Sequence, residues 1–236
     1  MMTDIKVSII LPVYNEEQAL EGVLQDVLRQ GIPNCEIIVI DDGSTDRSLR
    51  IAQSFIQYGI RVVPHYIHSG MGAALLTGAI QSTGEYVVWM DADGQHRGID
   101  TKKIVEEVRK SHGELDYIIG VRDKKSHRVK NRILGKTILR KIVEYYAHTS
   151  LPDFNSGLRV FRKSLLLSFS HMYPRGFSTS TVTSILMARL QEYKGITMFF
   201  TMLPRQGKSS VCQMKDGIKA IWYSKKTDAY INKRKL

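Results

Sequence analysis

The chain has 236 residues, 34 of them Lys or Arg and 23 Asp or Glu, so its formal net charge is +11. This length suits one large domain, or one domain with a small appendage, and a hydrophobic fraction of 43% is enough for a packed core. The positive charge favours polyanionic partners such as nucleic acid, anionic membranes or phosphorylated substrates, although a merely basic, soluble surface explains it equally well.

The two cysteines, Cys35 and Cys212, form no CxxC pair and no disulfide framework, so we expect a reducing compartment. The N-terminal residues lack the basic stretch and apolar run of a signal peptide. No apolar stretch approaches the roughly 18 residues of a membrane span. These features predict a cytoplasmic protein that meets a membrane, if at all, as a peripheral protein on the cytoplasmic face.

Short apolar runs alternate with helical patterns through the first half of the chain. The strand-like runs occupy residues 7–11, 36–40, 61–66, 85–90 and 115–121. The helical patterns occupy residues 17–30 and 45–58. Strands that alternate with helices predict parallel pairing, and a continuous apolar run such as 37–40 predicts a sheet covered on both faces. The expected fold class is therefore α/β, with a mostly parallel, Rossmann-like sheet and helices on both faces.

The second half of the chain is more basic. Residues 122–141 are dense in Lys and Arg and lead into a helix that ends near His148. A loop enters a strand over 153–161, and a helix over 179–192 and a strand over 196–203 follow. We therefore expect a main domain of residues 1–207 and a basic tail of residues 208–236 that can bind a membrane surface or a partner.

Unusual polar groups follow three of the predicted strands. These groups are Pro12 to Glu16 after the first strand, Asp41 to Ser44 after the second and Asp91 to His96 after the fourth. Ligands of an open α/β sheet gather at the carboxyl ends of its strands. Although far apart in sequence, the three segments should therefore meet at one edge of the sheet.

Asp91 and Asp93 stand two residues apart on a chain that leaves a strand, so extended geometry points both carboxylates the same way. Two hard oxygen ligands suit Mg²⁺ or Mn²⁺, and Gln95 could supply a third oxygen. Such a metal takes its remaining ligands from substrate phosphates and neutralises the charge of a departing diphosphate. The alternative is a polar turn that Gly94 closes.

The other two strand ends offer groups for a nucleoside. Tyr14 can stack on a base, and Asp41 can accept a hydrogen bond from a base N–H. Glu16 could contact the base or cap the following helix, and for Asp42 and Ser44 we favour capping.

A glycine segment follows the third strand-like run. Residues 68–74 lack the third glycine of a dinucleotide fingerprint, and they do not follow the first strand. Gly70 is therefore expected at a tight entry into a helix whose backbone lies near the ligand.

The segments Val-Tyr-Asn-Glu, Asp-Asp-Gly-Ser and Asp-Ala-Asp-Gly-Gln-His, in this order, resemble the family 2 inverting glycosyltransferases, which have the GT-A fold. The resemblance covers about residues 5–165 and is closest to the dolichyl-phosphate mannosyltransferase and polyprenyl-phosphate glycosyltransferase branch. His68 departs from the pattern, because the family usually has asparagine there.

The resemblance implies a role for each matching position. The nucleoside-binding positions are Pro12, Tyr14, Glu16 and Asp41, and the metal and diphosphate positions are Asp91, Asp93 and Gln95. It further implies that Arg122 lies near the phosphates, that Asp153 is an acidic residue near the acceptor, and that Arg205 closes over the donor. The implied reaction is a single in-line displacement with inversion, in which the metal and Arg205 stabilise the departing nucleoside diphosphate.

The acceptor decides whether a base is needed. A sugar hydroxyl must lose a proton, which would require a carboxylate such as Asp153. A lipid phosphate is already largely a dianion at neutral pH and needs cations instead. The cluster of Arg128, Arg132 and Lys136 could hold such a polyprenyl phosphate, and the basic tail could rest on anionic lipid.

Other functions remain open at this point. The acceptor could be a saccharide hydroxyl, or the chain could bind a nucleotide without catalysis. A sugar nucleotidyltransferase would carry a glycine-rich, arginine-containing loop after the first strand, where this chain has residues 12–16. We find no recognised nucleic-acid-binding module and expect no nucleic acid partner. The donor could be a UDP- or a GDP-linked sugar.

Overall fold

The computed structural model describes residues 5–123, 125–126, 133–207 and 213–234, with the backbone alone at 133–136 and 213–214. In this part of the chain seven strands form one sheet in the order β3-β2-β1-β4-β6-β5-β7. In chain order the strands are β1 Val7–Val13, β2 Cys35–Asp41, β3 Arg61–Pro64, β4 Tyr86–Met90, β5 Tyr117–Arg122, β6 Leu158–Arg162 and β7 Gly195–Phe200.

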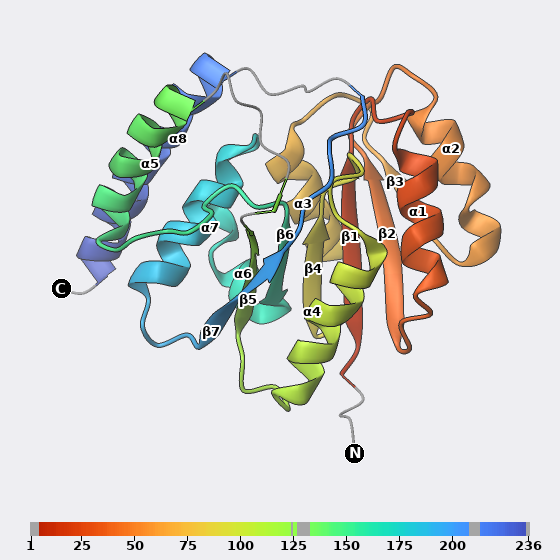
Figure 1. Ribbon diagram of the computed structural model, residues 1–236, viewed down its shortest axis with the longest axis horizontal. Coiled ribbons are helices and arrows are strands. Elements are labelled where there is room, and N and C mark those ends of the chain that lie inside the picture. The colour runs from red at the N-terminus through yellow and green to blue at the C-terminus, as the bar shows by residue number, and fades with distance from the viewer. Residues whose placement is uncertain (1–4, 124, 127–132, 208–212, 235–236) are drawn as a thin grey trace.

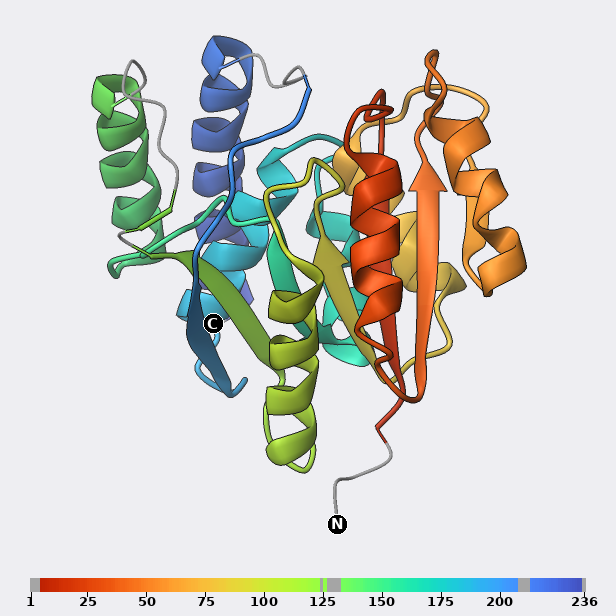
Figure 2. The same ribbon diagram turned by 45° about the vertical axis from the view of Figure 1, so that its right-hand side comes forward.

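Helices cover both faces of the sheet (Figures 1 and 2). One face carries α1 Leu20–Arg29, α2 Ser48–Ser54 and α4 Gly98–Lys110, and the other carries α3 Met71–Gln81, α6 Lys163–Ser168 and α7 Ser178–Arg189. Because both faces are covered, Ile38, Val39 and Ile40 of β2 are completely buried. The apolar run at 37–40 therefore packs between two cores, as the sequence predicted.

The sheet is parallel except at β6, which runs antiparallel to both β4 and β5. The expectation of a mostly parallel sheet is confirmed. Because β6 runs in the opposite direction, it starts at the edge where β4 ends, with Leu158 opposite Met90. The residues just before β6 therefore lie beside those just after β4, and the Asp91 N–H donates to Gly157 O at 3.2 Å.

The first two helices begin later than the sequence patterns suggest. The helix predicted from residue 17 begins at Leu20, and the one predicted over 45–58 becomes α2 and a short 3-10 helix, Ile56–Tyr58. The released residues form loops at the carboxyl ends of β1 and β2. Asn15, with a left-handed φ of 55°, turns the first of these loops.

The basic tail contains the helix α8 Gln213–Arg234, which lies beside α5 Ile133–Ala147 and packs on α7 (Figure 2). Arg189 of α7 contacts Asp228 and Asn232 of α8, and Ile231 is completely buried. Residues 213–234 therefore share a core with the main domain. No helix in the described segments is both long and apolar enough to cross a membrane.

Candidate active site

The loops after β1 and β2 are held together by side chains at their tips. The Asn15 N–H donates to Ser44 Oγ at 3.1 Å, and the Thr45 N–H donates to Asn15 Oδ1 at 2.8 Å. The Glu16 N–H donates to Ser48 Oγ at 2.8 Å. Ser44 thus ties two strand ends together instead of capping α2, whose N-cap residue is Arg47.

Arg205 joins the first and fourth strand ends. Its guanidinium pairs with Asp93 Oδ2 at 2.7 Å and with Glu16 Oε1. Burial raises the pKa of Glu16 to about 7, and the charge of Arg205 opposes this rise. The structure therefore brings together three residues that are widely separated in the sequence and that the family resemblance assigned to the donor site.

The chain after β7 crosses over the strand ends to deliver Arg205 (Figure 1). The Leu203 N–H donates to Gln95 O at 3.0 Å, and the Gln206 N–H donates to Asp93 O at 3.0 Å. These backbone bonds attach the late segment to the Asp93 loop, so the position of Arg205 does not depend on its side-chain contacts alone.

Asp91 occupies a niche that exists because residue 157 is glycine. A Cβ at this position would lie 1.9 Å from Asp91 Oδ2. Burial and the neighbouring charge of Asp93 both raise the pKa of Asp91. Two carboxylates are therefore held close together in a poorly solvated place, an arrangement that a divalent cation would stabilise.

The residues around Asp91 and Asp93 fit a metal whose remaining ligands come from substrate. The Gln95 amide nitrogen donates to Leu203 O at 3.3 Å, so the amide oxygen is the atom that Gln95 can offer. The described residues contain no cluster of three or more His, Cys, Asp or Glu side chains placed to hold a metal. Two carboxylates and one amide match the few protein ligands of Mg²⁺ in phosphate-transferring sites.

Asp153 forms a bidentate ion pair with Arg122 at the end of β5. Arg122 Nε and Nη2 lie 2.6 and 2.8 Å from the two carboxylate oxygens. Burial of Asp153 raises its pKa, but the Arg122 guanidinium outweighs this and holds the pKa below its ordinary value. An ionised carboxylate with both oxygens engaged is a weak proton acceptor.

Arg159 lies completely buried behind this pair. It donates five hydrogen bonds, two of them at 2.8 Å to the carbonyl oxygens of Phe154 and Ser156 in the loop after Asp153, and the others to Ser180 O, Thr183 Oγ1 and Ser184 Oγ of α7. The guanidinium thus fixes the Asp153 loop against α7. No sequence pattern indicated this role for Arg159.

Asp41 lies buried at the end of β2. Its Oδ2 accepts a hydrogen bond from the Ser44 N–H at 3.1 Å. Its Oδ1 is also buried and has no hydrogen-bond partner in the part of the chain that the structure describes. An unpaired buried acceptor is costly, so this oxygen is well suited to a ligand N–H.

Asp42 anchors the loop between β3 and α3. Its carboxylate lies 2.7 Å from His65 Nδ1 and 2.9 Å from His68 Nδ1, and it accepts the N–H groups of Ser69 and Gly70 at 2.9 and 2.7 Å. Asp42 is therefore a loop anchor rather than a helix cap. Gly70, at φ 97°, forms the tight entry into α3 that the sequence predicted.

The anchored loop places His68 against Tyr14, in the loop after β1. The rings of Tyr14 and His68 stack with centroids 3.8 Å apart and planes at 30°. The sequence identified Tyr14 as a stacking residue but described His68 only as a departure from the family pattern. No sequence pattern predicted this contact, because His68 lies in a loop three residues before the start of α3.

Pro12 is the penultimate residue of β1, where it pairs with Ile40 of β2 after the pairing with β4 has ended at Ile10. Arg128 and Arg132 lie outside the described residues, as does the side chain of Lys136, so the predicted acceptor cluster stays a prediction.

Comparisons with known proteins identify the family to which the sequence is similar. The family model described as Glycosyl transferase family 2 matches residues 8–169. An undecaprenyl-phosphate 4-deoxy-4-formamido-L-arabinose transferase of Pectobacterium carotovorum is 30% identical over 74% of this chain and 54% of its own length. A dolichol-phosphate mannosyltransferase of Pyrococcus furiosus is 31% identical over 68% of this chain and 47% of its own length. The chain thus matches about half the length of these relatives.

Among solved structures, glucosyl-3-phosphoglycerate synthase from Mycobacterium tuberculosis, in complex with Mn²⁺, UDP and phosphoglyceric acid, superposes with a TM-score of 0.74. The two proteins share 18% sequence identity, and the superposition covers 95% of this chain and 78% of the other. At this identity the likeness establishes the fold alone, and it confirms the GT-A architecture.

Proposed function

Because this chain belongs to glycosyl transferase family 2, we propose that it transfers a sugar, with inversion, from a nucleoside diphosphate sugar to a polyprenyl phosphate. The proposal that the chain binds a nucleoside diphosphate sugar rests on the contact of Arg205 with both Glu16 and Asp93. This contact joins a strand end suited to a nucleoside with a strand end suited to a diphosphate.

The donor lies across the carboxyl ends of β1, β2 and β4. Tyr14 and Asp41 bind the base, with Pro12 and Glu16 beside them, and Gly70 brings the start of α3 close to the ligand. The guanidinium of Arg205 lies at Asp93, where it binds the leaving diphosphate and stabilises the negative charge that develops there. Arg122, at the end of β5, is the second cation near the phosphates.

A divalent cation, Mg²⁺ or Mn²⁺, would be held by Asp91, Asp93 and Gln95, and it would neutralise charge on the diphosphate as the sugar leaves. The chain contributes the orientation of these ligands. Gly157 gives Asp91 its niche, and the Leu203 contact turns the Gln95 amide. Burial makes the close approach of two carboxylates unfavourable, and a divalent cation would compensate them beyond the charge that Arg205 already supplies at Asp93.

The ion pair of Asp153 with Arg122 favours a phosphate acceptor over a hydroxyl. A hydroxyl must be deprotonated, and Asp153 is a poor base while both its oxygens are engaged. A lipid phosphate has a second pKa of about 6 and attacks without prior loss of a proton. The names of two relatives, an undecaprenyl-phosphate 4-deoxy-4-formamido-L-arabinose transferase and a dolichol-phosphate mannosyltransferase, support the same acceptor class. Arg128, Arg132 and Lys136 are the proposed cations for this phosphate.

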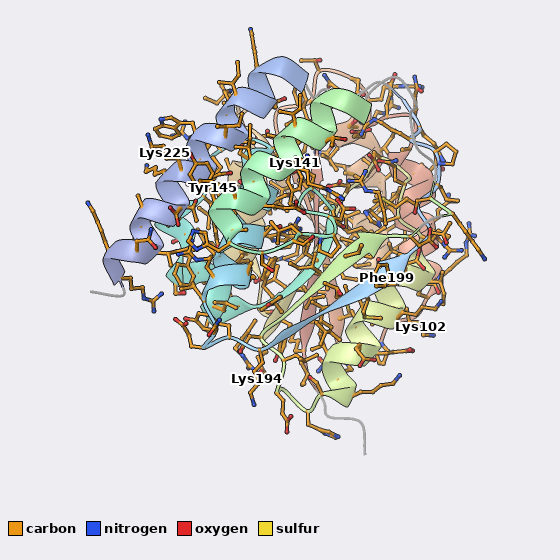
Figure 3. The ribbon with its side chains drawn as sticks, turned by 60° about the vertical axis from the view of Figure 1, so that its left-hand side comes forward. Lys102, Lys141, Tyr145, Lys194, Phe199 and Lys225 are labelled. Carbon is orange, nitrogen blue, oxygen red and sulfur yellow. The ribbon has the colours of Figure 1, made fainter. Side chains whose placement is uncertain are left out.

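A lipid acceptor requires contact with a membrane. Figure 3 shows Lys141 and Tyr145 of α5 beside Lys225 of α8. Tyr145 of α5 is 74% exposed, and Trp222 of α8 is 56% exposed. Exposed aromatic side chains among lysines suit an anionic lipid surface. The proposed location is therefore the cytoplasmic face of a membrane, as a peripheral protein.

The test is a transfer assay with UDP- and GDP-linked sugars, each offered with a polyprenyl phosphate or a free saccharide, with Mn²⁺ or with a chelator. We expect metal-dependent transfer to the polyprenyl phosphate. Asp93→Asn should abolish it, whereas Glu21→Gln, at an exposed carboxylate on α1, should not. Transfer to the saccharide alone would replace the lipid by a saccharide acceptor. Nucleotide binding without transfer to either acceptor would leave a nucleotide-binding protein.

A further inference from the structure

A groove runs along the last two strands of the sheet, on the face that α7 covers. Its volume is about 520 Å³, within the range of sites for small organic molecules. The described residues that line it come from β5, β7, α7 and the loop of residues 149–153. Ile119 of β5 lies at its floor, and Met187 and Ala188 of α7 form one wall. Of these described lining residues, Asp153 alone belongs to the candidate active site.

Polar groups inside the groove have partners within the protein. The Tyr117 hydroxyl donates to a backbone carbonyl of α7 at 3.2 Å, and the Ser184 hydroxyl accepts from Arg159 at 2.9 Å. Both carboxylate oxygens of Asp153 bind Arg122. The described lining residues include no Lys or Arg and no buried polar atom without a partner. In a chain with a net charge of +11, this surface suits an uncharged ligand that needs no hydrogen bonds, namely a hydrocarbon.

The two ends of the groove differ. At the amino end of β5 the Tyr117 ring lies over Gly195 of β7, since a Cβ on Gly195 would lie 2.2 Å from the ring. The Tyr117 hydroxyl reaches Met187, so the side chain spans the groove from strand to helix and closes this end. At the carboxyl end of β5 lies Asp153, whose partner Arg122 is the proposed cation near the phosphates. The groove therefore begins beside the proposed phosphate site.

Apolar side chains of β7 line the open side of the groove. β7 is the last strand of the sheet, so its outer edge pairs with no other strand of the described chain. Phe199 follows the lining residue Thr197 by two positions and pairs with Val121, so it lies on the face that bears the groove. Phe199 is 66% exposed (Figure 3), and the lining residue Ile196 is 37% exposed. A hydrocarbon in the groove would cover part of this exposed apolar surface.

We propose that this groove binds the first prenyl units of the acceptor, with the phosphate end beside Asp153 and the chain running towards Tyr117. From Val121 to Tyr117 the strand rises about 13 Å. A prenyl unit adds four bonds, about 4–5 Å when extended, so the groove holds about three units. The rest of a longer chain leaves over the edge of β7 at Ile196. This inference rests on the proposed function, because it concerns the chain of the same acceptor.

Calorimetric titration of the full chain with prenyl monophosphates of increasing length tests the proposal. The probes are dimethylallyl, geranyl, farnesyl and geranylgeranyl phosphate, each below its critical micelle concentration. We expect Kd to fall about tenfold or more with the second and again with the third prenyl unit, and less than about threefold with the fourth. Equal Kd values for all four, or no binding, would overturn the inference. Length-dependent binding without transfer in the assay above would keep the groove and remove the proposed function.

Two substitutions fill the groove from opposite sides. Thr197→Trp, at an exposed position of β7, and Ala188→Phe, on α7, should each weaken farnesyl phosphate binding about tenfold or more and dimethylallyl phosphate binding less than about threefold. Ile80→Trp is the matched control, because Ile80 is 60% exposed on α3 and does not line the groove. Wild-type affinity for farnesyl phosphate in both variants would overturn the proposal. A larger loss in Trp222→Ala than in Thr197→Trp would also overturn it, because the chain would then lie on α8.

Discussion

Substitution of Gly157 is the sharpest test of the proposed metal site, because it perturbs Asp91 without changing any polar group. In Gly157→Ala the added methyl group would lie 1.9 Å from Asp91 Oδ2 and 2.2 Å from Asp91 Cγ. Since real Cβ contacts essentially never fall under 3.0 Å, the carboxylate must move by about 1 Å. A displacement of this size at a catalytic group can cost about a hundredfold in rate, or about 2.7 kcal/mol.

The assay separates loss of the metal ligand from loss of the fold. We expect kcat/KM of Gly157→Ala to fall about a hundredfold, with weaker Mn²⁺ binding in the presence of UDP. Overpacking should lower the free energy of unfolding by about 1–3 kcal/mol, a shift of a few degrees in Tm. Gly176→Ala is the control, because its added Cβ would meet no heavy atom of the described residues within 4 Å, its two chain neighbours aside. Wild-type turnover and Mn²⁺ affinity in Gly157→Ala would refute the assignment of Asp91 as a metal ligand.

Three further predictions concern charged side chains. In Arg205→Lys the single ammonium group cannot replace the planar guanidinium that contacts both Glu16 and Asp93, so kcat at saturating donor should fall about a hundredfold. A near-normal kcat would contradict the proposed role of Arg205 at the diphosphate. Arg159→Met removes five buried hydrogen bonds, so the free energy of unfolding measured in urea should fall by about 3 kcal/mol or more. A fall of less than about 1 kcal/mol would contradict the role of Arg159 in fixing the Asp153 loop against α7. Glu36 is partly desolvated, but hydrogen bonds from Ser8, Thr83 and Arg61 lower its pKa from 4.5 to about 2. Its contribution to stability is therefore present above pH 4.5 and lost as pH falls towards 2, so the difference in urea midpoint between the wild type and Glu36→Gln should narrow below pH 4.5; a constant difference would exclude this linkage.

The sequence predicted the parts of the site that follow from strand ends. Apolar runs located the strands, and parallel order then brought the loops after β1, β2 and β4 together. Arg205 was predicted from the family resemblance alone, because no local pattern connects residue 205 with Glu16. In the structure, the chain after β7 crosses the strand ends and bonds to the Asp93 loop, which brings Arg205 to Glu16.

Other parts of the site depend on packing that a sequence pattern does not express. Asp42 has the sequence position of a helix cap, but its carboxylate instead binds four groups of the loop between β3 and α3. The direction of β6 could not be predicted, because a short apolar run reads the same in a parallel and in an antiparallel strand. Without that direction, Gly157 could not be assigned to the niche of Asp91.

The covalent order of the chain also sets the order in which this site can be completed during synthesis. The strands that carry Tyr14, Asp41 and Asp91 emerge early, but the niche for Asp91 needs residue 157 and the bridge to Glu16 needs residue 205. A nascent chain that ends before β7 therefore contains Tyr14 and Asp41, which we propose bind the base, but lacks Arg205, which we propose binds the diphosphate. The contacts among Glu16, Asp93 and Arg205 can therefore form only after the chain beyond β7 has been synthesised.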